Sequence, residues 1–160
     1  MENFAVALIS VVGALLGTLM GGWLSLRATT KQHALQRQDQ ELRLLDDSFF
    51  RAIDELEAYR RLELTRAHES TLQGVSPADA PSAPDVRTAR SVCRRALLAF
   101  KVHSQEPHRT HQLDQIFAEI ETISDQPDVA TVRAVSSGVT DRLEAAVVEF
   151  SELRQARLNR

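Results

Sequence analysis

The pattern of apolar and polar residues divides the chain into two parts. Residues 4–26, with the sequence FAVALISVVGALLGTLMGGWLSL, contain no charged side chain. A helix of this length, rising about 1.5 Å per residue, is long enough to cross the hydrocarbon core of a bilayer. Beyond residue 29 apolar residues recur at helical spacing, and all five prolines fall at breaks in that spacing. The pattern predicts an all-α protein with one N-terminal transmembrane helix followed by an antiparallel helical bundle.

Two other interpretations of the N-terminal segment are less favoured. A cleavable signal peptide begins with basic residues, has a shorter apolar run and ends in a small-x-small site. Here the chain starts Met1-Glu2-Asn3, and LSLR at residues 24–27 is a poor cleavage site. A buried core helix rarely carries so long an uncharged run. We therefore expect a transmembrane anchor over residues 1–28, with the lipid bilayer as its surroundings.

The flanking charges predict the orientation of this anchor. Glu2 precedes the apolar run, whereas Arg27, Lys31, Arg37 and Arg43 follow it. Excess Lys and Arg are retained on the cytoplasmic side of a membrane. We expect a single-pass protein of the cell membrane, with its N-terminus outside and its C-terminal domain in the cytoplasm.

Small residues recur every four positions within the apolar run. Such rows allow two helix backbones to approach closely in lipid, although glycine and alanine are also generally frequent in membrane helices. The pattern favours a packing face for a second copy of the chain or for another membrane protein. This face comprises Gly13, Gly17, Gly21, Ser10, Ala14, Thr18 and Gly22.

The rest of the chain is predicted to form four amphipathic helices. Residues 29–72 would contain a polar stalk and the first bundle helix, and whether anchor and stalk form one continuous helix is left open. Residues 73–84 read as a proline-rich linker with little to bury, and residues 85–160 hold the remaining bundle helices, with breaks near Pro107 and Pro127.

Apolar stripes at helical spacing define the expected core. In the first helix the stripe comprises Leu42, Leu45, Phe49, Ala52, Leu56 and Tyr59, widened by Leu44, Phe50, Ile53, Leu62 and Leu64. In the second helix it comprises Val86, Ala89, Cys93, Ala96, Leu97 and Phe100, and in the third Leu113, Ile116, Phe117, Ile120 and Ile123. In the last it comprises Val129, Val132, Val135, Val139, Leu143, Ala146, Val147, Phe150 and Leu153.

Composition narrows the range of functions. The 160 residues include 19 basic and 22 acidic side chains, for a net charge of −3. This balance makes nucleic acid an improbable partner. The single cysteine, Cys93, rules out an internal disulfide and lies on a predicted buried face. Because no nucleophile, phosphate-binding or nucleotide motif occurs, we expect neither an enzyme nor a cofactor.

Two clusters of polar residues could carry chemistry. His103, His108 and His111 lie near two carboxylates and could in principle hold a metal, but no second pair of ligands is evident, and a solvated turn is the simpler interpretation. Arg87, Arg90 and Arg94 share a helix face and could meet an anionic partner. The alternative is a solvated face with ion pairs to acidic residues of the first helix, Asp54, Glu55 or Glu57.

The layout of the whole chain resembles a family of small membrane proteins. The segments that carry the resemblance are VVGALLGTLMGGWLSL, RATTKQHALQRQ, RRLELTRAHES and, after a proline-bearing linker, DVRTARSVCRRALLAFKVHS. These resemble the single-pass Kil and spread proteins of actinomycete conjugative plasmids. The resemblance implies a role in spreading a plasmid between hyphal compartments, and growth impairment when production is unregulated. It includes no catalytic or binding motif, so it assigns no functional residue.

Two classes of function follow. The first is a membrane-anchored helical interaction protein that associates through its anchor and docks an unidentified cytoplasmic protein. The second is a pore-forming or holin-like growth inhibitor, in which small faces pack helices around an opening. The lack of charged or strongly polar side chains between residues 4 and 26 disfavours a wide aqueous pore.

Overall fold

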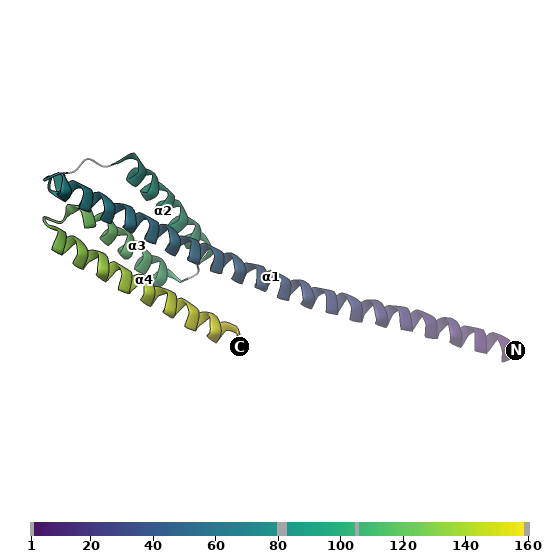
Figure 1. Cartoon of the computed structure of the whole chain (residues 1–160). Helices are drawn as coiled ribbons and strands as arrows, with labels where there is room; N and C mark the ends of the chain where they lie inside the picture. The colour runs from purple at the N-terminus through teal and green to yellow at the C-terminus, as the bar shows by residue number, and fades with distance from the viewer. Residues whose placement is uncertain (1, 80–82, 105, 159–160) are drawn as a thin grey trace. The chain divides into compact units, whose positions relative to one another are not determined.

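The elements of the fold are helices throughout the described chain. The structure, a computed structural model, describes the backbone of residues 2–79, 83–104 and 106–158. Side chains are described for these residues except 2–19, 21–22, 24, 26–28, 30–31, 34–35 and 158. The elements are α1 (Glu2–Leu72), η1 (Pro77–Asp79), α2 (Pro84–His103), α3 (Pro107–Glu121), η2 (Ile123–Asp125) and α4 (Val129–Leu158) (Figure 1). The described residues contain no strand, which confirms the all-α prediction.

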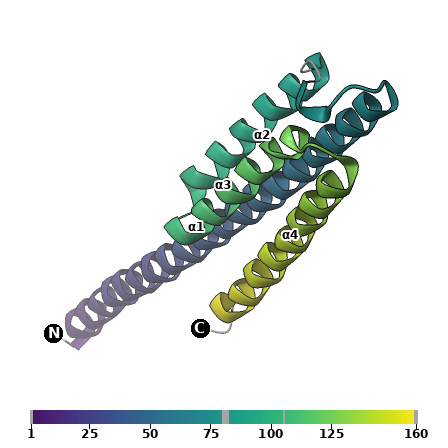
Figure 2. The ribbon, with the colours of Figure 1, turned by 90° about the vertical axis from the view of Figure 1, so that its left-hand side faces the viewer.

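The chain divides into two compact units, residues 1–43 and residues 44–160. The second unit is the helical bundle, in which α2, α3 and α4 lie alongside the C-terminal part of α1 (Figures 1 and 2). The helices of this unit start and end close to the breaks that the prolines predict. The predicted boundary between anchor and stalk at residue 28 stays a prediction.

The core of the bundle is centred on α1. At one end of the bundle the Phe49 ring stacks on Phe150 of α4 at 3.8 Å between centroids and meets Phe100 of α2 edge-on at 5.5 Å. Further along, Tyr59 packs on Phe117 of α3 with centroids 5.7 Å apart. One helix therefore contacts all three others, and burial of its aromatic side chains contributes a large part of the apolar area removed from water.

Most residues of the predicted stripes are buried or partly buried, but three are not. Leu44, Phe50 and Leu153 are exposed by 51%, 41% and 43%. Successive residues of an α-helix are rotated by about 100° about its axis. Phe49 lies at the centre of the buried face, so Phe50 lies at its edge. Leu153 lies one turn beyond Phe150, the last buried residue of α4. The predicted stripes were therefore too wide in α1 and too long in α4.

Local polar contacts end α1 and start α4. Gly74 has φ +72°, and its N–H donates to the Thr71 carbonyl while the Val75 N–H donates to the Ser70 carbonyl. This is a Schellman motif, which needs a left-handed residue. At α4, the Asp128 carboxylate accepts the Thr131 N–H at 2.9 Å, which is the contact that an N-cap residue makes. That hydrogen bond holds the pKa of Asp128 below its usual value, so its stabilising effect is lost as the pH falls through that pKa.

The predicted linker is partly structured. Residues 77–79 form η1, which contacts η2 at the same end of the bundle. Pro77 is buried there, so the expectation that this segment has little to bury is wrong at that position. Residues 80–82 of the linker lie outside the described part of the chain.

The predicted anchor lies mostly outside the residues whose side chains are described. Among the described residues, none of the helices combines the length and the apolar character that crossing a bilayer requires. The side chains of the predicted packing face at positions 10, 13, 14, 17, 18, 21 and 22 also lie outside the described residues. Anchor and packing face therefore stay predictions.

Two glycines give a matched test of the fold. A methyl group added at Gly138, inside α4, would meet nothing within 4 Å. Gly138→Ala should raise the free energy of unfolding by about 0.5–1 kcal/mol, because glycine is a poor helix former. Gly74→Ala should lower it by about 1–2 kcal/mol, because alanine is strained in the left-handed conformation. Urea unfolding of the two variants, followed by circular dichroism, measures both changes in the free energy of unfolding. A destabilised Gly138→Ala variant would contradict the packing of α4.

Candidate functional site: a polar cleft between α1, α2 and α3

A polar concavity of about 430 Å³ lies in the described part of the bundle. It lies between α1, α2, α3 and η2, and we call it the polar cleft. It is lined by Tyr59, Glu63 and Arg66 of α1, Val86, Arg87 and Arg90 of α2, Ala118 and Glu121 of α3, and Thr122, Ser124 and Asp125.

The base of the polar cleft is a buried ion pair. Glu63 is only 3% exposed, and its Oε2 lies 3.3 Å from Nη1 of Arg66, three residues further along α1. The same Nη1 donates to the hydroxyl of buried Ser124 at 3.0 Å, which joins α1 to η2. A carboxylate removed from water in this way requires a charged partner. Burial is the main reason that the pKa of the neighbouring Tyr59 is raised, and the negative charge of Glu63 raises it further.

Two arginines of α2, Arg87 and Arg90, line the rim of the polar cleft, and Arg94 follows them outside the lining. Arg90 donates through Nε to Oε1 of Glu121 on α3, and this hydrogen bond raises the pKa of Arg90. Arg94 reaches the same oxygen at 3.4 Å, and its guanidinium lies 5.4 Å from the centre of the Phe117 ring. The side chain of Arg87 is exposed and makes no ion pair or hydrogen bond with any described residue.

The structure separates the three arginines that the sequence groups together. Arg87 and Arg90 line the polar cleft, whereas Arg94 lies outside its lining and covers Phe117. The acidic partner of Arg90 and Arg94 is Glu121 of α3, whereas the sequence suggested Asp54, Glu55 or Glu57 of α1. The reason is geometric, since the arginine face of α2 borders α3.

Sequence reasoning missed the pair at the base of the polar cleft. Glu63 follows Leu56 and Tyr59 at helical spacing and precedes Ala67, and all four are buried. A glutamate that continues an apolar stripe was the available signal, because such a residue is buried only with a partner. Arg66 gave no comparable signal, since its partner Ser124 is 58 residues away.

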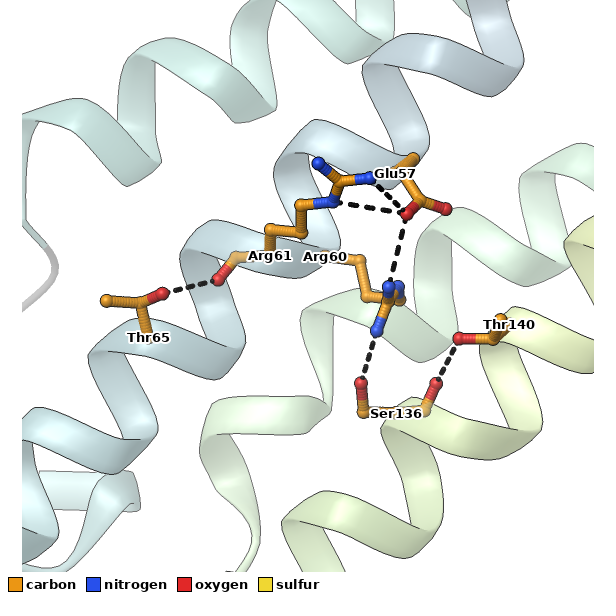
Figure 3. A network of polar contacts seen from close by, with 6 residues as sticks. All are labelled: Glu57, Arg60, Arg61, Thr65, Ser136 and Thr140. Carbon is orange, nitrogen blue, oxygen red and sulfur yellow. Dashed lines mark hydrogen bonds and ion pairs between the residues drawn. The ribbon is translucent and has the colours of Figure 1, made fainter.

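A second polar network joins α1 to α4. Arg60 donates through Nη1 to the Ser136 hydroxyl at 2.8 Å and lies 3.3 Å from Glu57, which Arg61 also contacts at 2.8 Å (Figure 3). The hydrogen bond from Arg61 is the main reason that the pKa of Glu57 is lowered. Ser136 is 3% exposed, and Nε of Arg60 finds no hydrogen-bond partner among the described residues. This network is a contact between two helices of the bundle.

The other candidate residues are not brought together. Within the described part of the chain, no group of three or more His, Cys, Asp or Glu residues is placed to hold a metal ion. His111 contacts Gln115 at 3.0 Å, and Asp114 pairs with Lys101 at 2.7 Å. Cys93 is fully buried, and burial raises the pKa of its thiol to about 12, which leaves it unreactive near neutral pH.

Comparison with models of known protein families, with curated proteins and with solved structures gives no match.

Replacing the buried carboxylate tests the base of the polar cleft. Glu63→Gln should lower the free energy of unfolding by about 2–3 kcal/mol, because it removes the buried carboxylate that pairs with the Arg66 guanidinium. The matched control is Glu57→Gln, which removes a more exposed carboxylate with two arginine neighbours and should cost about 1 kcal/mol or less. Urea unfolding can be followed by the reaction of Cys93 with a maleimide. Equal costs for the two variants would contradict the buried pair.

Proposed function

We propose that the chain is a single-pass membrane protein that acts by docking another protein, without catalysing a reaction. Residues 1–28 serve as the anchor, and the bundle of residues 44–160 serves as a cytoplasmic docking domain. The observation that carries this proposal is the continuity of α1: one helix, Glu2–Leu72, contains both the 4–26 run without charge and the central residues of the bundle core.

The exposure of two large side chains in the apolar run supports an anchor. Met20 and Trp23 are exposed by 66% and 61%. An uncharged helix with such side chains needs an apolar environment, and lipid provides one. Trp23 precedes Arg27 by one helical turn, a position where an amphipathic ring suits the boundary between lipid and water.

The small residues of the anchor support self-association. Two neighbouring rows at a spacing of four residues would let two helices pack closely within the bilayer. Such pairing would bring two bundles together at one membrane site. By its resemblance to the Kil and spread proteins, we propose that the resulting assembly assists the spread of a conjugative plasmid.

Membrane insertion and orientation can be tested with single cysteines. Asn3→Cys and Ser151→Cys place a thiol at either end, while buried Cys93 stays silent in the folded chain. In intact cells a membrane-impermeant maleimide should label only the Asn3→Cys variant, and permeabilisation should expose Ser151→Cys. The chain should also remain in the membrane fraction at alkaline pH. Release at alkaline pH, or labelling of Ser151→Cys in intact cells, would contradict the proposal.

Self-association is tested within the anchor. Gly17→Leu places a large side chain in the centre of the predicted packing face and should reduce the crosslinked fraction in membranes several-fold. The matched control, Val12→Leu, adds bulk on the opposite predicted face and should leave crosslinking unchanged. Crosslinking that is insensitive to Gly17→Leu would remove the anchor as the site of association.

A further inference from the structure

We propose that the polar cleft binds a carboxylate side chain, Asp or Glu, from an acidic segment of the partner protein. This inference rests on the proposed docking function and identifies the chemistry of its partner. The donors that would hold the carboxylate are Arg87 and Arg90, with Asp125 as an additional acceptor at the same cleft.

Arg87 and Arg90 provide the donors. They lie three residues apart on α2, so their side chains project from the same face of the helix. Arg87 is exposed and has no partner among the described residues, and Arg90 uses its Nε on Glu121. The contact with Glu121 fixes the Arg90 guanidinium at the cleft. The two terminal nitrogens of Arg90 form no ion pair with any described residue. Paired guanidinium groups match the planar geometry of a carboxylate.

The charge balance of the polar cleft favours a guest with one negative charge. Its lining holds Arg66, Arg87 and Arg90 against Glu63, Glu121 and Asp125, and Arg94 contacts Glu121 from outside the lining. The lining by itself is balanced, but Glu63 pairs with Arg66 and Glu121 pairs with Arg90, so Arg87 is left as a guanidinium group without a carboxylate partner among the described residues. A monoanionic carboxylate matches the single charge of Arg87, whereas a phosphate dianion would exceed it and face three nearby carboxylates.

The remaining lining suits a peptide better than a free anion. Asp125 is exposed and makes no ion pair with a described residue, so it can accept a backbone N–H of an extended segment. Val86 and Ala118 offer apolar surface to the methylene groups of a Glu side chain. A volume of about 430 Å³ accommodates one side chain and its adjacent backbone. These features together point to a short acidic segment as the guest.

The test uses the full chain in detergent micelles, with arginine side chains labelled with ¹⁵N for NMR. The probe is a capped hexapeptide of alternating Glu and Gly, and its matched control carries Gln in place of Glu. The Glu peptide should shift the Nε–H signals of Arg87 and Arg90 saturably. Arg87→Gln should weaken binding about tenfold, as expected for loss of one charge-assisted hydrogen bond. Arg95→Gln, an exposed arginine of α2 outside the cleft lining, should leave binding unchanged.

Each alternative outcome overturns the proposal. Absence of a saturable shift, or equal binding of the Gln peptide, would show that the cleft does not recognise a carboxylate. Tighter binding of inorganic phosphate would identify a different anion, and equal losses in Arg87→Gln and Arg95→Gln would indicate general attraction to basic residues. Unchanged melting of Arg87→Gln confirms that its fold is intact. The cysteine labelling of the anchor is independent, so membrane insertion and peptide binding can fail separately.

Discussion

The bundle depends on burial of one stripe of α1, from Phe49 to Ala67. Phe49, Leu56 and Tyr59 in this stripe are each exposed by 2% or less, and together they meet all three other helices. Without this stripe α2, α3 and α4 would lose the shared surface on which their apolar faces pack. Because the stripe belongs to the helix that also contains the uncharged run, the bundle is formed by the same element that is proposed to anchor it.

Buried charges determine which surfaces of α1 meet which neighbours. The Glu63–Arg66 pair meets Ser124 at η2, and Arg60 meets Ser136 of α4. Buried ion pairs contribute little net stability, but an alternative packing that separated them would leave a charge uncompensated. The two networks therefore favour a single register of α1 against its neighbours, and the first of them also forms the base of the polar cleft.

Much of the fold follows from the sequence, whereas the cleft does not. The prolines at 84, 107 and 127 and the 3.6-residue spacing of apolar side chains predict where α2, α3 and α4 lie, because both effects are local. The partner of Arg90 could not be predicted, because Glu121 is 31 residues away and the choice between α1 and α3 depends on helix packing. Exposure of Leu44 and Leu153 was missed for the same reason: spacing identifies a face but not the extent of its neighbour.

Hydrogen exchange of the full chain in lipid nanodiscs tests the central claim, an anchor in lipid joined to a bundle formed outside it. The account predicts slow exchange for the amides of residues 4–26 and of residues 49–67, with faster exchange in the polar stretch 30–43 between them. In the first segment lipid would exclude water, and in the second the other three helices would do so. Exchange in residues 4–26 as fast as in residues 30–43 would contradict the account.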